Sequence, residues 1–100
     1  MRQQYVYFLK LIPSLLNDEN WTEKENAIVG RHFKRLQHML AEGSLVLAGR
    51  TQNYNPTGIV ILEADSEDEA RRLMEADPTV AEGIMTAELF PYSVALIRKS

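Results

Sequence analysis

Short runs of apolar residues separated by polar stretches predict three strands in the first two thirds of the chain. Residues 4–12, QYVYFLKLI, are apolar on both alternating sets, and Pro13 ends the run, so we expect a strand covered on both faces. Residues 44–49 and 58–64 are short, mostly apolar segments of the same kind. The polar segment 50–57 between them contains Asn and Pro, which favour turns, so it is expected to join antiparallel neighbours.

Two capping boxes mark where the helices begin. Thr22 is followed three residues later by Glu25, which predicts a helix that runs to about residue 42 and ends at Gly43. Ser66 and Glu69 repeat this spacing and predict a short acidic second helix. Both helices carry an apolar stripe at helical period, as expected for elements that cover one face of a sheet.

The end of the chain predicts a further turn and a fourth strand. Residues 79–82 form a possible extra turn closed by Gly83, and the last strand is expected over residues 86–97. Pro91 cannot donate to a strand ladder, which argues for an edge strand or a bulge. The element order βαββαβ predicts an α+β, ferredoxin-like domain with a four-stranded antiparallel or mixed sheet, in which the first and third strands are central.

The strands are apolar on both faces, although two helices can cover only one face of a four-stranded sheet. The other face therefore needs cover from elsewhere. The economical solution is a second copy, with the two sheets packed face to face about a two-fold axis. We therefore expect a homodimer.

Composition narrows the class of protein. With 100 residues and no cysteine, the chain is expected to be a single domain, residues 1–100, without disulfides or a thiolate site. The net charge of −3 comes with no basic stripe, so no nucleic-acid partner is expected. No apolar run approaches the roughly 20 residues of a membrane span, and the N-terminal apolar run, broken by Lys10 and Pro13, indicates a strand instead of a signal peptide. We expect a cytoplasmic protein with no membrane partner.

Asp77 stands directly before Pro78, and two interpretations of it remain open. A carboxylate ahead of a proline can cap a short helix, because it accepts from free N–H groups while Pro fills the first position. Alternatively, Asp77 pairs with His32 across a pocket. With Val29 at zero and about 100° per residue, His32 falls at roughly 300°, inside the apolar stripe of the first helix, and His38 near 180°, opposite it.

A helix with an inward His, then LAGRT, GIVILEADSEDEA and ADPTVAEGI together carry a family resemblance. The pattern resembles the YCII-related domain family (YciI-like) of the dimeric α+β barrel superfamily, over most of the chain and most densely from Leu47 to Ile84. The resemblance implies a homodimer with a pocket in each protomer and a His–Asp pair as the active site, at His32 and Asp77. Family members with a known activity resemble lyases or dehalogenases acting on small aromatic or enol-type compounds.

A His–Asp pair suits proton transfer. An imidazole titrates near physiological pH, and a carboxylate bonded to one ring nitrogen leaves the other free to take or give a proton. The serines lie in no nucleophile motif, so acid–base lyase, isomerase or dehalogenase chemistry is favoured over hydrolysis. Two alternatives remain. The first is a non-catalytic protein that binds a small ligand, and the second is a structural protein in which His32 is a core histidine satisfied by Asp77.

Other residues have candidate roles beside the pair. Arg50 follows the second strand, where a guanidinium could hold an anionic substrate, or it could make a surface salt bridge. Tyr7 could place its hydroxyl in the pocket, or it could simply pack. A metal on His32 and Asp77 would lack a third ligand, and the acids from Glu63 to Glu69 are explained by helix capping and the helix dipole. We expect no metal and no cofactor.

Overall fold

The chain folds as one sheet with helices on one side. The structure is a computed structural model that describes residues 2–98. Its strands are β1 (Gln3–Leu11), β2 (Leu45–Arg50), β3 (Thr57–Ala64) and β4 (Met85–Tyr92), and its helices are α1 (Glu23–Glu42), α2 (Glu67–Glu75) and α3 (Pro78–Ala81). Two short 3-10 segments, η1 (Pro13–Leu16) and η2 (Asp18–Asn20), link β1 to α1.

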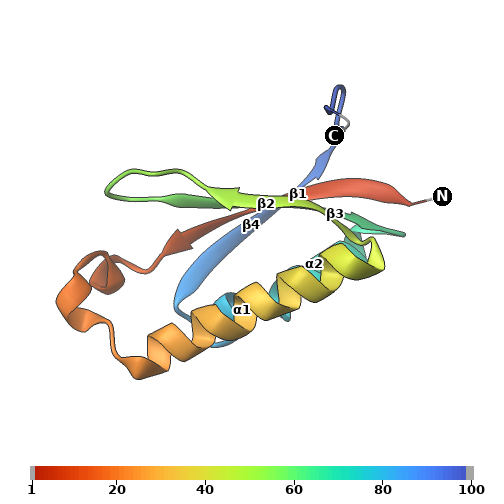
Figure 1. The fold of residues 1–100 in the computed structure, drawn as a ribbon. Coiled ribbons are helices and arrows are strands. Elements are labelled where there is room, and N and C mark those ends of the chain that lie inside the picture. The colour runs from red at the N-terminus through yellow and green to blue at the C-terminus, as the bar shows by residue number, and fades with distance from the viewer. Residues whose placement is uncertain (1, 99–100) are drawn as a thin grey trace.

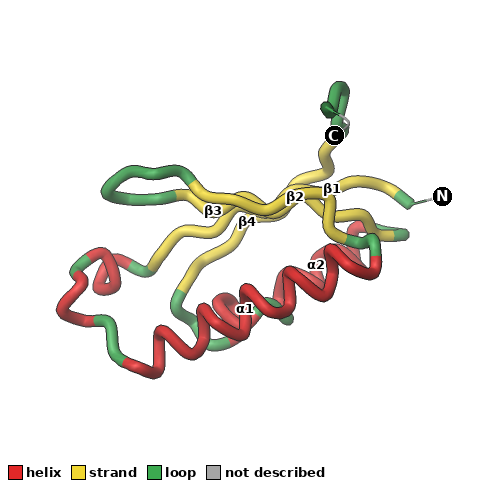
Figure 2. The backbone as a smooth tube through the Cα atoms, viewed as in Figure 1, coloured by secondary structure: helices red, strands yellow, loops and turns green. Residues whose placement is uncertain are grey.

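The sheet order is β2-β3-β1-β4, and each neighbouring pair of strands is antiparallel. The first and third strands are therefore central and β4 lies at an edge, where Pro91 costs no ladder bond on its outer side. Figure 1 shows α1 and α2 along one face of this sheet, and Figure 2 shows the helical segments gathered on that same side. The predicted α+β, ferredoxin-like order is confirmed.

Helix α1 begins and ends where its sequence signals lie. The Thr22 side chain accepts from the Lys24 backbone N–H, and the Glu25 side chain accepts from the Thr22 N–H, which completes a capping box. At the other end, Gly43 adopts a φ of 94°, a left-handed conformation that other residues rarely adopt. These two signals set the ends of α1, the helix that carries His32.

The main core lies between the helices and the sheet. Alternate residues of the central strands point into it, so that one face of each strand is buried against α1 and α2. Its buried members are Tyr5, Tyr7, Leu9, Leu36, Met39, Leu45, Val60, Leu62, Ala64, Ala70 and Met74. A smaller cluster of Leu15, Ile28 and Ile84 packs under η1 and the first half of α1.

The last strand is shorter than the sequence predicts. It ends at Tyr92, whereas a strand reaching residue 97 was expected. The reason is its partner: Tyr92 pairs with Gln4, and β1 begins only one residue further on, at Gln3, so almost no partner strand remains to continue the ladder. Beyond it, the Val94 N–H donates to the Gln4 side chain at 2.8 Å, and the chain leaves the sheet on the side away from the helices (Figure 1).

The face of the sheet opposite the helices is apolar. Because side chains alternate along a strand, the neighbours of the core residues point to this face. They include Val6, Phe8, Ile59, Ile61 and Phe90. The Phe8 and Phe90 rings meet edge to face at 5.9 Å between centroids, and 46% of Phe90 is exposed. Within residues 2–98, no helix lies on this face, and none is long and apolar enough to cross a membrane.

We propose that a second copy of the chain covers this face. The expected result is a species of twice the 11.4 kDa chain mass in light scattering coupled to gel filtration. Phe90→Glu should shift it to the monomer, because a charge on an apolar interface loses its solvation. Tyr54→Glu is the matched control, since Tyr54 is 81% exposed in the β2–β3 loop. A wild-type monomer at concentrations of about 0.1 mM would contradict the proposal.

Candidate active site

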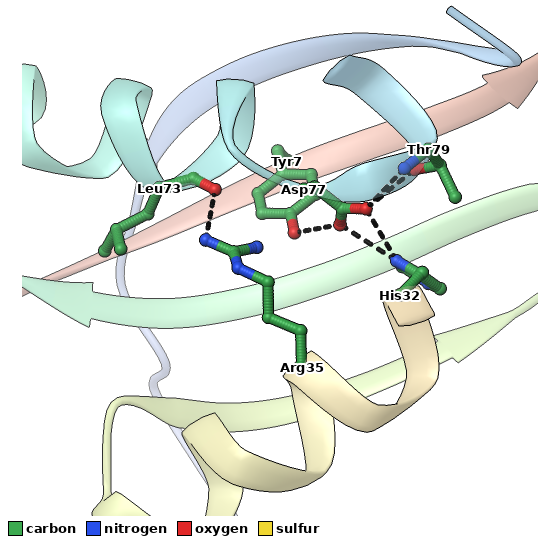
Figure 3. A network of polar contacts seen from close by, with 6 residues as sticks. All are labelled: Tyr7, His32, Arg35, Leu73, Asp77 and Thr79. Carbon is green, nitrogen blue, oxygen red and sulfur yellow. Dashed lines mark hydrogen bonds and ion pairs between the residues drawn. The ribbon is translucent and has the colours of Figure 1, made fainter. Parts of the chain in front are cut away.

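His32 and Asp77 lie in contact although 45 residues separate them. The His32 Nδ1 lies 2.8 Å from Oδ1 and 2.9 Å from Oδ2 of Asp77. Because an ionised carboxylate can only accept, Nδ1 carries the proton and donates to Asp77. The other ring nitrogen, Nε2, is then the one left for a ligand. The structure thus brings together the two residues that the sequence predicts as a pair (Figure 3).

Asp77 also caps α3, so both interpretations of this residue apply at once. Its Oδ1 accepts from the Thr79 backbone N–H at 3.0 Å and from the Thr79 hydroxyl at 2.8 Å. Pro78 occupies the first turn of α3, where no N–H donor is needed. The cap fixes the carboxylate on the backbone, and Asp77 is fully buried. A carboxylate held in this way can orient the His32 ring.

Tyr7 is the third member of this network. Its hydroxyl donates to Asp77 Oδ2 at 2.7 Å, and the residue is fully buried on the central strand β1. The sequence left two roles open for Tyr7, a hydroxyl that contacts substrate in the pocket or a side chain that simply packs. The structure instead places it against Asp77, behind the dyad, because the β1 face that carries Tyr7 packs under α1 and α2.

Arg35 is the member that sequence reasoning missed. It lies three positions after His32 on α1, and this spacing places both side chains on neighbouring parts of one helix face. Its Nη2 donates to the Leu73 carbonyl at 2.7 Å, and its Nη1 is buried with no partner among the described residues. Figure 3 shows the guanidinium beside the Tyr7 hydroxyl. The i, i+3 spacing from a candidate catalytic histidine was the available signal.

The network sets the charge state of its members. Burial alone would raise the pKa of Asp77, but hydrogen bonds from His32 and Tyr7, the His32 charge and the Thr79 bond together hold it below its usual value. Burial and the neighbouring Asp77 carboxylate raise the pKa of Tyr7 far above its usual value, and Arg35 only partly opposes this. Asp77 therefore stays ionised and Tyr7 stays a neutral donor at physiological pH.

A cleft of about 1390 Å³ opens between α1 and the β2–β3 side of the sheet. His32 and Arg50 both line it, whereas Asp77 and Tyr7 lie behind its wall. The rest of its lining is mainly apolar and includes Trp21, Phe33, Leu36, Leu40, Leu47 and Tyr54. Apolar walls with a few polar groups are typical of small-molecule sites. Arg50 is exposed, and within residues 2–98 no carboxylate lies at ion-pair distance from it.

The lowered pKa of Asp77 predicts an acid-sensitive fold. A carboxyl group whose folded pKa lies below the unfolded value, about 3.9, adds stability above that value and loses it as pH falls through the folded pKa. The contribution of Asp77 to the wild-type free energy of unfolding should therefore be lost progressively as pH falls below about 4. In urea titrations, Asp77→Asn should lose less stability over that range. Equal slopes for the two proteins would contradict an ionised, stabilising Asp77.

Comparison with known proteins gives a match to one family model and matches to solved structures. The model of the YCII-related domain matches residues 4–92. The chain is similar to the solved structure of 5-chloro-2-hydroxyhydroquinone dehydrochlorinase (TftG) from Burkholderia phenoliruptrix AC1100 in complex with 2,5-dihydroxybenzoquinone. The TM-score is 0.69 at 18% identity, with 90% of this chain and 93% of that chain covered. No curated protein matches the chain significantly. At this identity the structural likeness shows a shared fold.

Proposed function

Because the chain belongs to the YCII-related domain family, we propose that it is a small-molecule enzyme that uses His32 and Asp77 for acid–base proton transfer. The observation that carries the proposal is the His32–Asp77 contact at the wall of an apolar cleft. Asp77 fixes the ring and stabilises its protonated form, and His32 exchanges the proton through Nε2. The substrate class is a hydroxylated aromatic or enol, and the reaction is an elimination of the dehalogenase or lyase type.

A chlorinated hydroxyhydroquinone illustrates how one base can carry out such an elimination. His32 first accepts a proton from a ring hydroxyl and returns it to the carbon that bears chlorine, which gives a keto tautomer. It then accepts a second hydroxyl proton, while the electron pair of that O–H bond forms a carbonyl and chloride leaves with the C–Cl pair. The net change is loss of HCl, so the ring becomes a quinone without an external oxidant. The likeness to TftG, a dehydrochlorinase by name, supports this choice.

Arg50 is proposed to hold the anionic oxygen of the substrate. It lines the same cleft as His32, and a guanidinium forms strong, charge-assisted hydrogen bonds to phenolate or enolate oxygens. Arg50 would thus bind the negative charge that develops when His32 takes a proton.

The direct test is chloride release from 5-chloro-2-hydroxyhydroquinone and other halogenated hydroxyaromatics by the wild-type protein. Chloride and the quinone absorbance should appear together in equal amounts, with turnover that depends on pH as a single ionising base requires. Ligand binding in calorimetry without chloride release across the panel would favour a non-catalytic binding protein. Neither binding nor release would leave a structural role for the pair.

Removing the charge at Arg50 should weaken substrate binding. Arg50→Met is expected to raise KM by about tenfold or more, because a charge-assisted hydrogen bond contributes about 1.5–3 kcal/mol, while kcat changes much less. Steady-state kinetics measure this split. Arg71→Met is the matched control, since Arg71 is an exposed α2 residue paired with Glu67 at 3.4 Å. An unchanged KM in Arg50→Met would remove Arg50 from the site.

A further inference from the structure

We propose that Arg35 and Tyr7 form a charge-compensating pair behind the dyad, which keeps His32 free to gain and lose its proton. This inference rests on the proposed function of His32 and adds two positioning residues to it. Neither residue touches the cleft: the cleft lining includes His32 and excludes Arg35 and Tyr7. Their effect on chemistry must therefore pass through Asp77.

The geometry places the Tyr7 hydroxyl between a cation and an anion. The hydroxyl donates its proton to Asp77 Oδ2, with 2.7 Å between the two oxygen atoms. The lone pairs of the Tyr7 oxygen are then available on the side where the Arg35 guanidinium lies (Figure 3). Arg35 is anchored from α2 by the Leu73 carbonyl, 2.7 Å from Nη2. This anchor leaves Nη1 buried and without a partner in the part of the chain that the structure describes.

A buried guanidinium nitrogen without an acceptor is costly unless an opposite charge lies near it. Here the opposite charge is Asp77, one hydroxyl away. Asp77 and Arg35 together carry no net charge, so the dyad is not forced to keep a proton on His32 to neutralise the carboxylate. Without Arg35, or without the Tyr7 bond that disperses the Asp77 charge, the carboxylate would favour protonated His32. A smaller fraction of His32 would then be neutral and able to act as a base.

The other charged groups on neighbouring elements are placed differently. Arg31, next to His32 on α1, meets Glu82 at 3.7 Å, and both side chains are about half exposed. Arg50 and Asp18 line the cleft and face solvent. Charges in these positions are screened by water, so they act on His32 more weakly than the buried pair. Arg31 is therefore a matched control of the same charge on the same helix.

The experiment compares Arg35→Met, Arg35→Lys, Tyr7→Phe and Arg31→Met with the wild type, each labelled with ¹⁵N in histidine. The ¹⁵N shifts of His32 near neutral pH give the fraction of rings with both nitrogens protonated. In Arg35→Met and Tyr7→Phe, the ratio of doubly to singly protonated rings should rise by at least about threefold. Arg35→Lys, which keeps the charge, should stay closer to the wild type, and Arg31→Met should not change.

Activity gives a second readout. The pH–activity profiles of Arg35→Met and Tyr7→Phe should move to higher pH, with KM within about twofold of the wild type because neither residue contacts the substrate. Folded variants with unchanged ¹⁵N shifts would overturn the inference and leave the pair a structural role. If Arg35→Met does not fold, Tyr7→Phe, which preserves ring volume, decides. If the variants change the His32 signal but the wild type turns over no substrate, the proposed function is wrong, while the effect of Arg35 and Tyr7 on the His32 proton is still demonstrated.

Discussion

His32→Gln is expected to lower kcat by about two to four orders of magnitude, the usual contribution of a positioned acid–base group. Glutamine has similar reach and can still hydrogen-bond to Asp77, but it cannot exchange a proton at neutral pH. The variant should still fold, because the His32 side chain lies at the cleft wall and is 15% exposed. Steady-state kinetics on the best substrate of the panel measure the loss.

The control for this substitution is His38→Gln. His38 lies on the exposed side of α1, where its Nε2 meets Glu42 at 3.4 Å. The His38→Gln substitution removes one imidazole from the same helix without changing the cleft, so kcat should stay within about twofold of the wild-type value. If both variants kept wild-type turnover, His32 would not be the acid–base group.

Asp77→Ala should reduce the free energy of unfolding by about 3 kcal/mol or more, which lowers Tm by roughly 12 °C or more in a domain of this size. The substitution leaves the Tyr7 hydroxyl and the Thr79 N–H buried without their acceptor, and it removes the cap of α3. The Arg35 charge also loses its counter-charge. Calorimetry and urea titration measure the change.

Asp68→Ala is the comparison for this loss. Asp68 is exposed in the first turn of α2, and its removal leaves no buried group without a hydrogen-bond partner. The free energy of unfolding should therefore change by no more than about 0.5 kcal/mol. Equal losses in the two variants would mean that the buried network contributes nothing beyond ordinary surface effects. Asp77→Asn should fall between them, because its amide oxygen can still cap α3.

Local periodicity was enough to place His32, because the side on which a helical residue lies depends only on the α1 pattern around it. The pairing with Asp77 is different in kind. It depends on how α1 crosses the sheet beside α3, which no short pattern encodes, and the family motif was what singled out the partner. The ferredoxin-like order likewise followed from capping boxes and strand patterns that act over a few residues.

The sequence did not predict what the Tyr7 hydroxyl and the Arg35 guanidinium contact. Alternation along β1 gives the face of Tyr7, but its hydroxyl could point to a cavity or to a neighbour, and the packing of α3 decided for Asp77. Arg35 was missed because arginine on a helix is usually a surface residue. The end of β4 was misplaced for a similar reason: the strand stops where β1 begins, and that register is a property of the assembled sheet.

The measurement that tests the role of His32 most directly is the ¹⁵N spectrum of its ring, with and without a hydroxyaromatic ligand. The geometry predicts the tautomer with the proton on Nδ1, bonded to Asp77, and an Nε2 signal that shifts when the ligand enters the cleft. The Nε2–H tautomer, or an Nε2 signal that ignores a ligand shown to bind, would contradict proton transfer by this histidine.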